Sequence, residues 1–370
     1  MPMTLVRATA LSILAAVACA CGSSSSDVPA SSATSPRRLL STEAAYTGVA
    51  WWHDDEIVLD VSSRATSSDP TIQWRTRRDG SHFERMKLPP VTDVCRRVEQ
   101  YWPQRLRDGA LALFRSCDGD SQAQTRNWIV RLKPDGSGWE KLVPATIIDA
   151  ETGTPLTSPN WGRYGDLYFP DFVVGPDQHS GFAETIGNCG SLVQLTQRGV
   201  LPLDVIVGSG DRTWNLREQL LNDPNDGCDR FGTAQAPTSD PDYRRVAFWA
   251  YLSVGVGISD RYKQPAEMLT IDPASLKISK LYGGVTSAGS LRWSPTGKWL
   301  AFTGAPNDKP FGLWLLNAET KALVLVARDV EITRLDWSPK GDALVYILEG
   351  PTTEKAFDYR SVWTVGIASP

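Results

Sequence analysis

Apolar and polar residues alternate in the same way along two stretches near the carboxyl end of the chain. LRWSPTGKWLAF covers residues 291–302, and LDWSPKGDALVY covers residues 335–346. In both, a short apolar run leads through Ser-Pro-x-Gly into a second apolar run, which predicts two β-strands joined by a tight turn. The proline fixes φ at the start of the turn, and Gly297 and Gly341 accept the positive φ that the turn needs. These stretches therefore form a repeated hairpin.

Weaker copies of this hairpin can be followed through most of the chain, which predicts six repeats. The glycine position of the turn is occupied in chain order by Asp55, Gly109, Gly165, Tyr243, Gly297 and Gly341, at intervals of 54, 56, 78, 54 and 44 residues. A further strand follows each hairpin, as in IQWRTR or GLWLLN. Units of about four antiparallel strands are typical of propeller blades. We expect an all-β fold, a six-bladed β-propeller of four-stranded antiparallel blades.

The Trp-Ser-Pro-x-Gly hairpin resembles the WD40-like repeats of the TolB propeller family, whose motif runs Trp-Ser-Pro-Asp-Gly-Lys before an apolar strand. The resemblance is close at 291–302 and 335–346, extends to 239–248, and with the periodicity covers about 44–370. It implies a six-bladed propeller. TolB also has an amino-terminal α/β domain, whereas this chain has a Ser-rich segment in that place. Because few residues follow the third strand of the last unit, we expect residues near Arg38 to Tyr46 to supply its fourth strand.

Tryptophans recur in two columns of this alignment. The first column holds Trp51, Trp161, Trp293 and Trp337, and the second holds Trp74, Trp128, Trp314 and Trp363. Aromatic residues repeated at one position of every unit are typical of packing between blades. We therefore interpret these eight residues as structural and not as a platform for a ligand.

The amino terminus has the pattern of an export signal. Residues 1–20 contain Arg7 followed by an uncharged apolar run that is short for a membrane span. The run ends in AVACACG, which resembles the lipobox of bacterial lipoproteins and implies lipidation of Cys21, with Cys19 as the alternative. Ordinary cleavage after Ala-x-Ala, with full secretion, is the other interpretation. We expect an exported protein, lipid-anchored to the extracytoplasmic side of the cell membrane.

Residues 21–43 are expected to form a flexible tether, because the Ser-rich segment offers little apolar surface to bury. The folded domain would then span residues 44–370. The full chain has a formal net charge of -4, which argues against nucleic acid as a partner. We expect a monomer.

Four further cysteines lie in the predicted propeller: Cys95, Cys117, Cys189 and Cys228. An exported protein can form disulfides, and four cysteines allow three sets of pairings. We favour the two pairings that are local in sequence, Cys95 with Cys117 and Cys189 with Cys228. No CxxC pair occurs and the three histidines are scattered, so we predict no metal site.

The interval of 78 residues exceeds its neighbours, and the surplus lies at about 205–238. Helical spacing of apolar residues there predicts a short helix and loop laid over one face. Long insertions on rigid scaffolds often carry function, although this one could equally be a cap that shields blade edges. The candidate residues for binding a partner are Trp214, Asp226, Asp229 and Arg230 on the insertion and His179 on a neighbouring loop.

The sequence contains no Gly-x-Ser-x-Gly elbow and leaves no residues for a hydrolase domain. We therefore predict no catalytic residue and no cofactor, and we leave open whether the protein is an enzyme. The first hypothesis is a module that binds or scaffolds an envelope protein. The alternative is an enzyme, or a protein that binds a glycan or small molecule, which uses the central channel.

Overall fold

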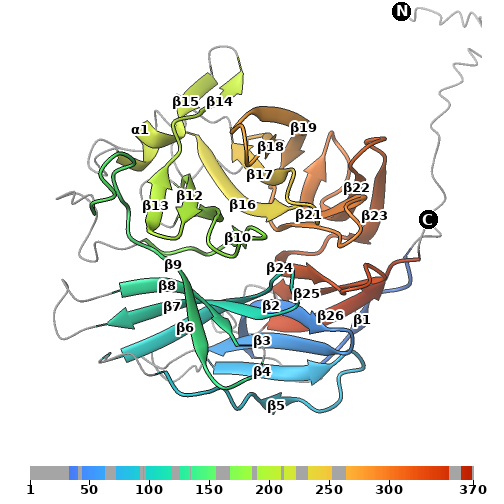
Figure 1. Cartoon of the computed structure of the whole chain (residues 1–370). Coiled ribbons are helices and arrows are strands. Elements are labelled where there is room, and N and C mark those ends of the chain that lie inside the picture. The colour runs from blue at the N-terminus through green and yellow to red at the C-terminus, as the bar shows by residue number, and fades with distance from the viewer. Residues whose placement is uncertain are drawn as a thin grey trace, which may run out of the picture.

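The all-β prediction is confirmed by the computed structural model (Figure 1). The described residues form 26 strands and one short helix. No helix among them is long and apolar enough to cross a membrane. The structure describes residues 33–40, 44–62, 72–91, 95, 97–118, 126–133, 135–155, 167–185, 190–209, 212–221, 232–251, 264–349 and 360–368.

The first three blades are separate four-stranded antiparallel sheets in chain order. Blade 1 consists of β2 (Ala45–His53), β3 (Glu56–Ser62), β4 (Ile72–Arg77) and β5 (Glu84–Arg85). Blade 2 consists of β6 (Arg97–Arg105), β7 (Leu111–Asp118), β8 (Arg126–Leu132) and β9 (Trp139–Pro144). Blade 3 consists of β10 (Phe172–Val174), β11 (Gly181–Glu184), β12 (Leu192–Thr196) and β13 (Gly199–Pro202).

Blades 4 and 5 are joined into one eight-stranded sheet through two residue pairs between β19 and β21. Blade 4 consists of β16 (Thr233–Ser239), β17 (Val246–Tyr251), β18 (Ala266–Ile271) and β19 (Ile278–Thr286). Blade 5 consists of β20 (Leu291–Trp293), β21 (Trp299–Pro306), β22 (Gly312–Asn317) and β23 (Leu323–Arg328). Blade 6 consists of β24 (Ile332–Trp337), β25 (Ala343–Glu349), β26 (Arg360–Gly366) and β1 (Arg37–Arg38).

Strand β1 supplies the outer strand of blade 6, so both ends of the chain close the ring as predicted, but the closing strand ends at Arg38 and Tyr46 belongs to blade 1. Arg37 pairs with Thr364 in an antiparallel register, and an isolated bridge joins Ala33 to Ile367. The expected tether boundary at residue 43 is therefore too late, because the segment already contributes to a sheet from Ala33 onward. Hydrogen bonding to the free edge of β26 orders residues that their composition alone would leave unstructured.

The predicted tight turns are present in the last three blades. Gly297 and Gly341 have φ of 70° and 73°, and Tyr243 takes the same left-handed conformation with φ of 55°. In blade 5 the Ser294 hydroxyl accepts a hydrogen bond from the backbone N–H of Trp299 at 3.1 Å. The motif thus encodes both the positive φ and a side-chain acceptor that holds the turn.

The third repeat is placed elsewhere than its sequence alignment indicates. The alignment put Gly165 in the turn, but Gly165 lies outside the described residues, and the first turn of blade 3 spans Gly175–Ser180. Asp177 accepts hydrogen bonds from the backbone of the next residues, and Gln178 has φ of 64°. An aspartate-capped turn replaces Pro-x-Gly here, so the motif offers no guide to this blade.

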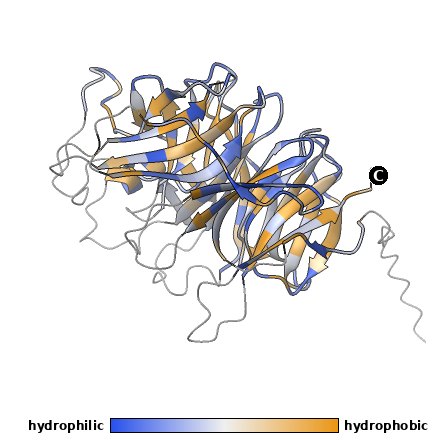
Figure 2. Ribbon diagram, turned by 90° about the horizontal axis from the view of Figure 1, so that it is seen from below, coloured by the Kyte–Doolittle hydropathy of each residue, from blue (hydrophilic) through white to orange (hydrophobic). Residues whose placement is uncertain are grey.

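Apolar side chains fill the space between blades, as the orange strands of Figure 2 indicate. Trp51, Trp293, Trp314 and Trp337 are all buried. The Trp337 indole N–H donates to the Arg292 carbonyl of the preceding blade at 3.1 Å. The interpretation as packing residues is confirmed for these four tryptophans, whereas Trp74, Trp128 and Trp363 are half-buried and Trp161 lies outside the described residues.

The propeller has two faces with different connections. Because consecutive strands run antiparallel, the turns from first to second strand emerge on one face, which we call the turn face. The links between blades emerge on the other, which we call the insertion face. On the insertion face lie the hairpin β14 (Ile206–Ser209) with β15 (Arg212–Asn215) and the helix α1 (Leu216–Leu221), grouped at one edge of the molecule in Figure 1.

Candidate functional site

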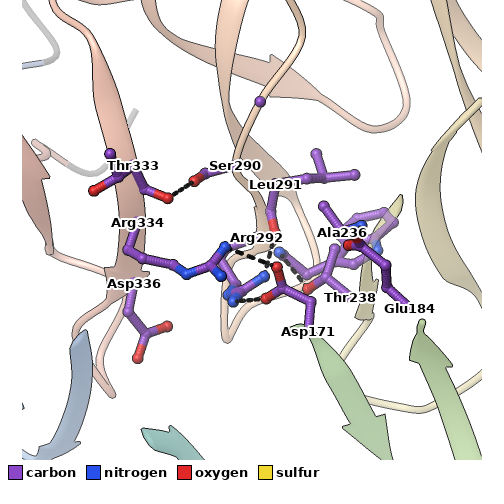
Figure 3. A network of polar contacts seen from close by, with 12 residues as sticks. Asp171, Glu184, Ala236, Thr238, Ser290, Leu291, Arg292, Thr333, Arg334 and Asp336 are labelled. Carbon is purple, nitrogen blue, oxygen red and sulfur yellow. Dashed lines mark hydrogen bonds and ion pairs between the residues drawn. The ribbon is translucent and has the colours of Figure 1, made fainter. Parts of the chain in front are cut away.

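An ion cluster joins three blades across the central channel. Asp171 lies directly before β10 of blade 3, and its carboxylate pairs with Arg292 of blade 5 and with Arg334 of blade 6, the latter at 3.0 Å. Figure 3 shows both guanidinium groups directed at this carboxylate. Burial opposes ionisation of Asp171, but the two arginines outweigh it and hold its pKa below the usual range. The cluster fixes the opposite sides of the ring to one another.

Three further carboxylates, of which Asp60 is fully buried and Glu184 and Asp336 are half-buried, each bind the innermost strand of the next blade. Glu184 accepts the backbone N–H of Ala236 at 2.7 Å, linking blade 3 to blade 4. Asp336 accepts the N–H of Trp51 at 2.8 Å, linking blade 6 to blade 1. Asp60 accepts the N–H of Trp102 and so links blade 1 to blade 2. These carboxylates satisfy backbone donors that the meander leaves free at its inner edge.

Burial raises the pKa of all three of these groups. It raises the pKa of Glu184 to about 8, with the charge of Asp171 adding to the effect. It raises the pKa of Asp60 to about 7 and also raises the pKa of Asp336. Perturbed carboxylates in a polar interior are candidates for function as well as for structure. Near neutral pH, therefore, Glu184 is mainly uncharged while Asp171 stays ionised.

Two connected cavities lead from the turn face into the channel. The outer cavity has a volume of about 420 Å³ and the inner one about 150 Å³. They share six lining residues, namely Gln104, Arg105, Val173, Ser239, Trp293 and Asp336. The inner cavity also reaches Arg292 of the ion cluster. The channel is thus an opening that narrows from the turn face toward buried charges.

The rim of the outer cavity comes from the first turns of several blades. Four prolines line it, Pro176, Pro241, Pro295 and Pro339, together with Tyr243 and Trp337. Proline has a fixed φ and few rotatable bonds, so this rim is rigid and presents apolar surface. The same residues that shape the turns therefore shape the mouth of the channel.

The insertion contains the predicted helix, but its tryptophan has a different role from the predicted one. Trp214 precedes α1, in β15, and is 5% exposed. Its indole N–H donates to the Gln219 side chain at 2.7 Å, and Gln219 in turn donates to the carbonyl of Gly190. Trp214 therefore anchors the insertion to blade 3 and cannot present its ring to a partner.

The other predicted contact residues have mixed outcomes. Asp226, Asp229 and Arg230 lie outside the described residues, as do Cys19 and Cys21. His179 lies in the first turn of blade 3, on the turn face, with its ring nitrogen 3.4 Å from the Leu142 carbonyl. The insertion packs at the other end of that blade, against Gly190. The structure therefore separates His179 from the insertion that it was expected to adjoin.

The local disulfide between Cys95 and Cys117 is present, which ties the approach to blade 2 to its second strand. Cys189 and Cys228 lie outside the described residues. Within the described part of the chain, no group of three or more histidine, cysteine or acidic side chains is placed to hold a metal ion.

No family model and no curated protein matches the sequence. Two solved structures superpose at a TM-score of 0.50. TolB from Acinetobacter baumannii is 14% identical over 85% of this chain and 64% of its own. An α-L-arabinanase from Penicillium chrysogenum, complexed with arabinobiose, is 11% identical over 90% of this chain and 98% of its own. This chain spans less than two thirds of the TolB structure, and at these identities the similarity shows the propeller fold alone.

Proposed function

We propose that this chain is an exported, lipid-anchored propeller that binds a partner protein at the cell envelope through its insertion. One observation carries the proposal. Among the described residues, the two large hydrophobic side chains that are exposed, Ile206 at 66% and Leu221 at 37%, both belong to the insertion. Exposed apolar residues on a segment anchored to a rigid scaffold are typical of protein contacts.

The insertion is suited to this role because it is anchored by residues other than those it exposes. Trp214, Leu216 and Leu220 are buried, and Asn215 caps α1 by accepting the backbone N–H of Arg217 at 2.8 Å. An ordered surface loses little conformational entropy when a partner binds. The exposed pair can therefore be replaced without disturbing the packing beneath it.

The test is cross-linking in intact cells, followed by purification of the tagged protein and mass spectrometry. We expect the wild type to recover a discrete envelope protein and the double variant Ile206→Ser, Leu221→Ser to recover it about fivefold less or worse, the scale for losing interface anchors. Thr213→Ala, an exposed change in the same insertion, is the control. Equal recovery by wild type and double variant would reject the insertion as the contact surface.

The membrane anchor is tested separately with the two candidate cysteines. Cys21→Ser should abolish incorporation of labelled fatty acid and release the protein from the membrane fraction, whereas Cys19→Ser should leave both unchanged. The opposite result would move the lipid to Cys19. If neither the wild type nor either variant incorporates labelled fatty acid, the lipid anchor is rejected.

A second candidate function is the binding of a small molecule or glycan in the channel. The outer cavity favours it, because about 420 Å³ falls within the ~300–1,000 Å³ of typical ligand sites. Binding is a better proposal than catalysis here, since Glu184, Asp60 and Asp336 are each engaged by a backbone N–H of a neighbouring blade.

A further inference from the structure

The lining of the two channel cavities contains hydrogen-bond donors without acceptors. Arg105 lines both cavities and is half-buried, and within the described residues its guanidinium forms no hydrogen bond or ion pair. The side-chain N–H groups of Gln104 and Trp293 are buried and have no partner in that part of the chain. The two buried N–H groups are enclosed by protein, whereas the guanidinium of Arg105 faces both cavities, where a charged acceptor could pair with it.

The charge balance around the inner cavity is also positive. Asp336 lies within the electrostatic reach of both Arg105 and Arg292, and Asp171 holds Arg292 and Arg334. Three guanidinium groups thus face the carboxylates of Asp171 and Asp336. Near neutral pH, burial keeps Asp60, with a pKa of about 7, partly protonated and keeps Glu184 mainly protonated. Both oxygens of Asp336 already accept backbone N–H groups, from Trp51 and Trp337. The arginine without a partner is Arg105.

We propose that the channel binds a small organic acid, with its carboxylate in the inner cavity against Arg105. An inner cavity of about 150 Å³ is below the usual size of a whole ligand site but has room for one charged group. The planar guanidinium of arginine matches a carboxylate with two parallel hydrogen bonds. The body of the acid would lie in the outer cavity.

The rim defines what the body of the acid must be. Pro241, Pro295 and Pro339 present rigid apolar surface at the mouth of the outer cavity. A hydrocarbon chain or a ring of five or six atoms suits these prolines. Of the polar groups on the rim, Arg107 and Asp242 are exposed and pair only at 3.8 Å, whereas others are held by neighbouring residues. Asp240, for instance, is already bonded to Arg245 at 3.1 Å. This inference rests on the second candidate function and is independent of the insertion.

The test uses matched pairs of acids and amides on the full mature protein, measured by isothermal titration calorimetry. The probes are phenylacetate with phenylacetamide and hexanoate with hexanamide, and sodium acetate reports on the carboxylate alone. We expect at least one acid to bind and its amide to bind about tenfold more weakly or worse, the scale of one charge-assisted hydrogen bond. Failure of both acids to bind at millimolar concentration would overturn the proposal, as would equal affinity for acid and amide.

Variants then assign the contact to one side chain. Arg105→Gln should weaken the acid about tenfold and leave the amide unchanged, and Arg105→Lys should weaken it less because the charge remains. Arg244→Gln removes the same charge from an 80% exposed side chain that does not line either cavity, and it should change nothing. Circular dichroism and thermal melting check that each variant folds. If wild type and a folded Arg105→Gln variant bind the acid equally well, the assignment to Arg105 is overturned. Either outcome leaves the partner-protein test with Ile206 and Leu221 unaffected.

Discussion

The two faces of the propeller differ in how their surfaces are made. The turn face is assembled from short first-to-second turns contributed by separate blades, and together these form one cavity with a rigid rim. The insertion face carries a single long connection that is held by its own anchor residues, such as Trp214 on Gln219. A surface built from repeats depends on the whole ring, whereas an insertion depends mainly on the blade beneath it. The two faces should therefore respond differently to mutation.

The largest loss of stability is expected for a substitution of Asp171, which links three blades across the channel. Asp171→Asn would remove the carboxylate that pairs directly with both Arg292 and Arg334, whose side chains are only 18% and 24% exposed. Removing one partner of a buried ion pair costs about 3–5 kcal/mol. We expect the free energy of unfolding, measured in urea, to fall by that amount.

Asp242→Asn provides the matched control on the turn face. Its carboxylate is 60% exposed and lies 3.8 Å from both Arg107 and Arg244, so these ion pairs are weak. The free energy of unfolding should therefore change by less than about 0.5 kcal/mol. If Asp171→Asn were as mild as this control, the ion cluster would not be what holds the opposite blades together.

The repeat made most of the fold predictable. Proline and glycine at fixed spacing imply a hairpin wherever they recur, and the last three blades have the expected turns at Tyr243, Gly297 and Gly341. Blade 3 departs because Asp177 holds the turn with its side chain, a solution that leaves no repeated glycine. Sequence periodicity reveals a turn only when every repeat forms that turn with the same residue types.

In the insertion, replacing a buried anchor residue should lower the free energy of unfolding by about 3 kcal/mol, whereas replacing an exposed residue should change it much less. Trp214→Ala removes a buried ring that packs between blades 3 and 4 and should destabilise the fold by that amount. Ile206→Ser alters a side chain that is 66% exposed and should change stability by less than about 0.5 kcal/mol. Chemical denaturation of both variants checks this. Comparable losses would mean that Ile206 belongs to the packing and not to a contact surface.

The candidate site was less predictable than the fold. Arg292 and Asp336 are polar residues set between apolar ones in the innermost strands, and this alternation could have marked them, whereas Arg334 follows a threonine. Asp171 lies before a three-residue strand with no repeated motif. Its pairing with two residues more than a hundred positions away follows from closure of the ring, which no local pattern encodes.

The smallest effect concerns Glu184, which lies between the two faces at the boundary of blades 3 and 4. Its pKa in the folded protein is about 8, above the value of a free glutamate, so the unfolded chain releases this proton at lower pH. The contribution of Glu184 is complete below the unfolded pKa and is lost as the pH rises through about 8. Glu184→Gln keeps the acceptor for the Ala236 N–H without a proton to lose. Between pH 5 and pH 7 we expect the wild type to lose about 2.5 kcal/mol of unfolding free energy relative to this variant, as measured by urea denaturation across pH. Parallel pH profiles would show that Glu184 is ionised in the folded channel, and the positive balance around Arg105 would then be smaller than the one derived above.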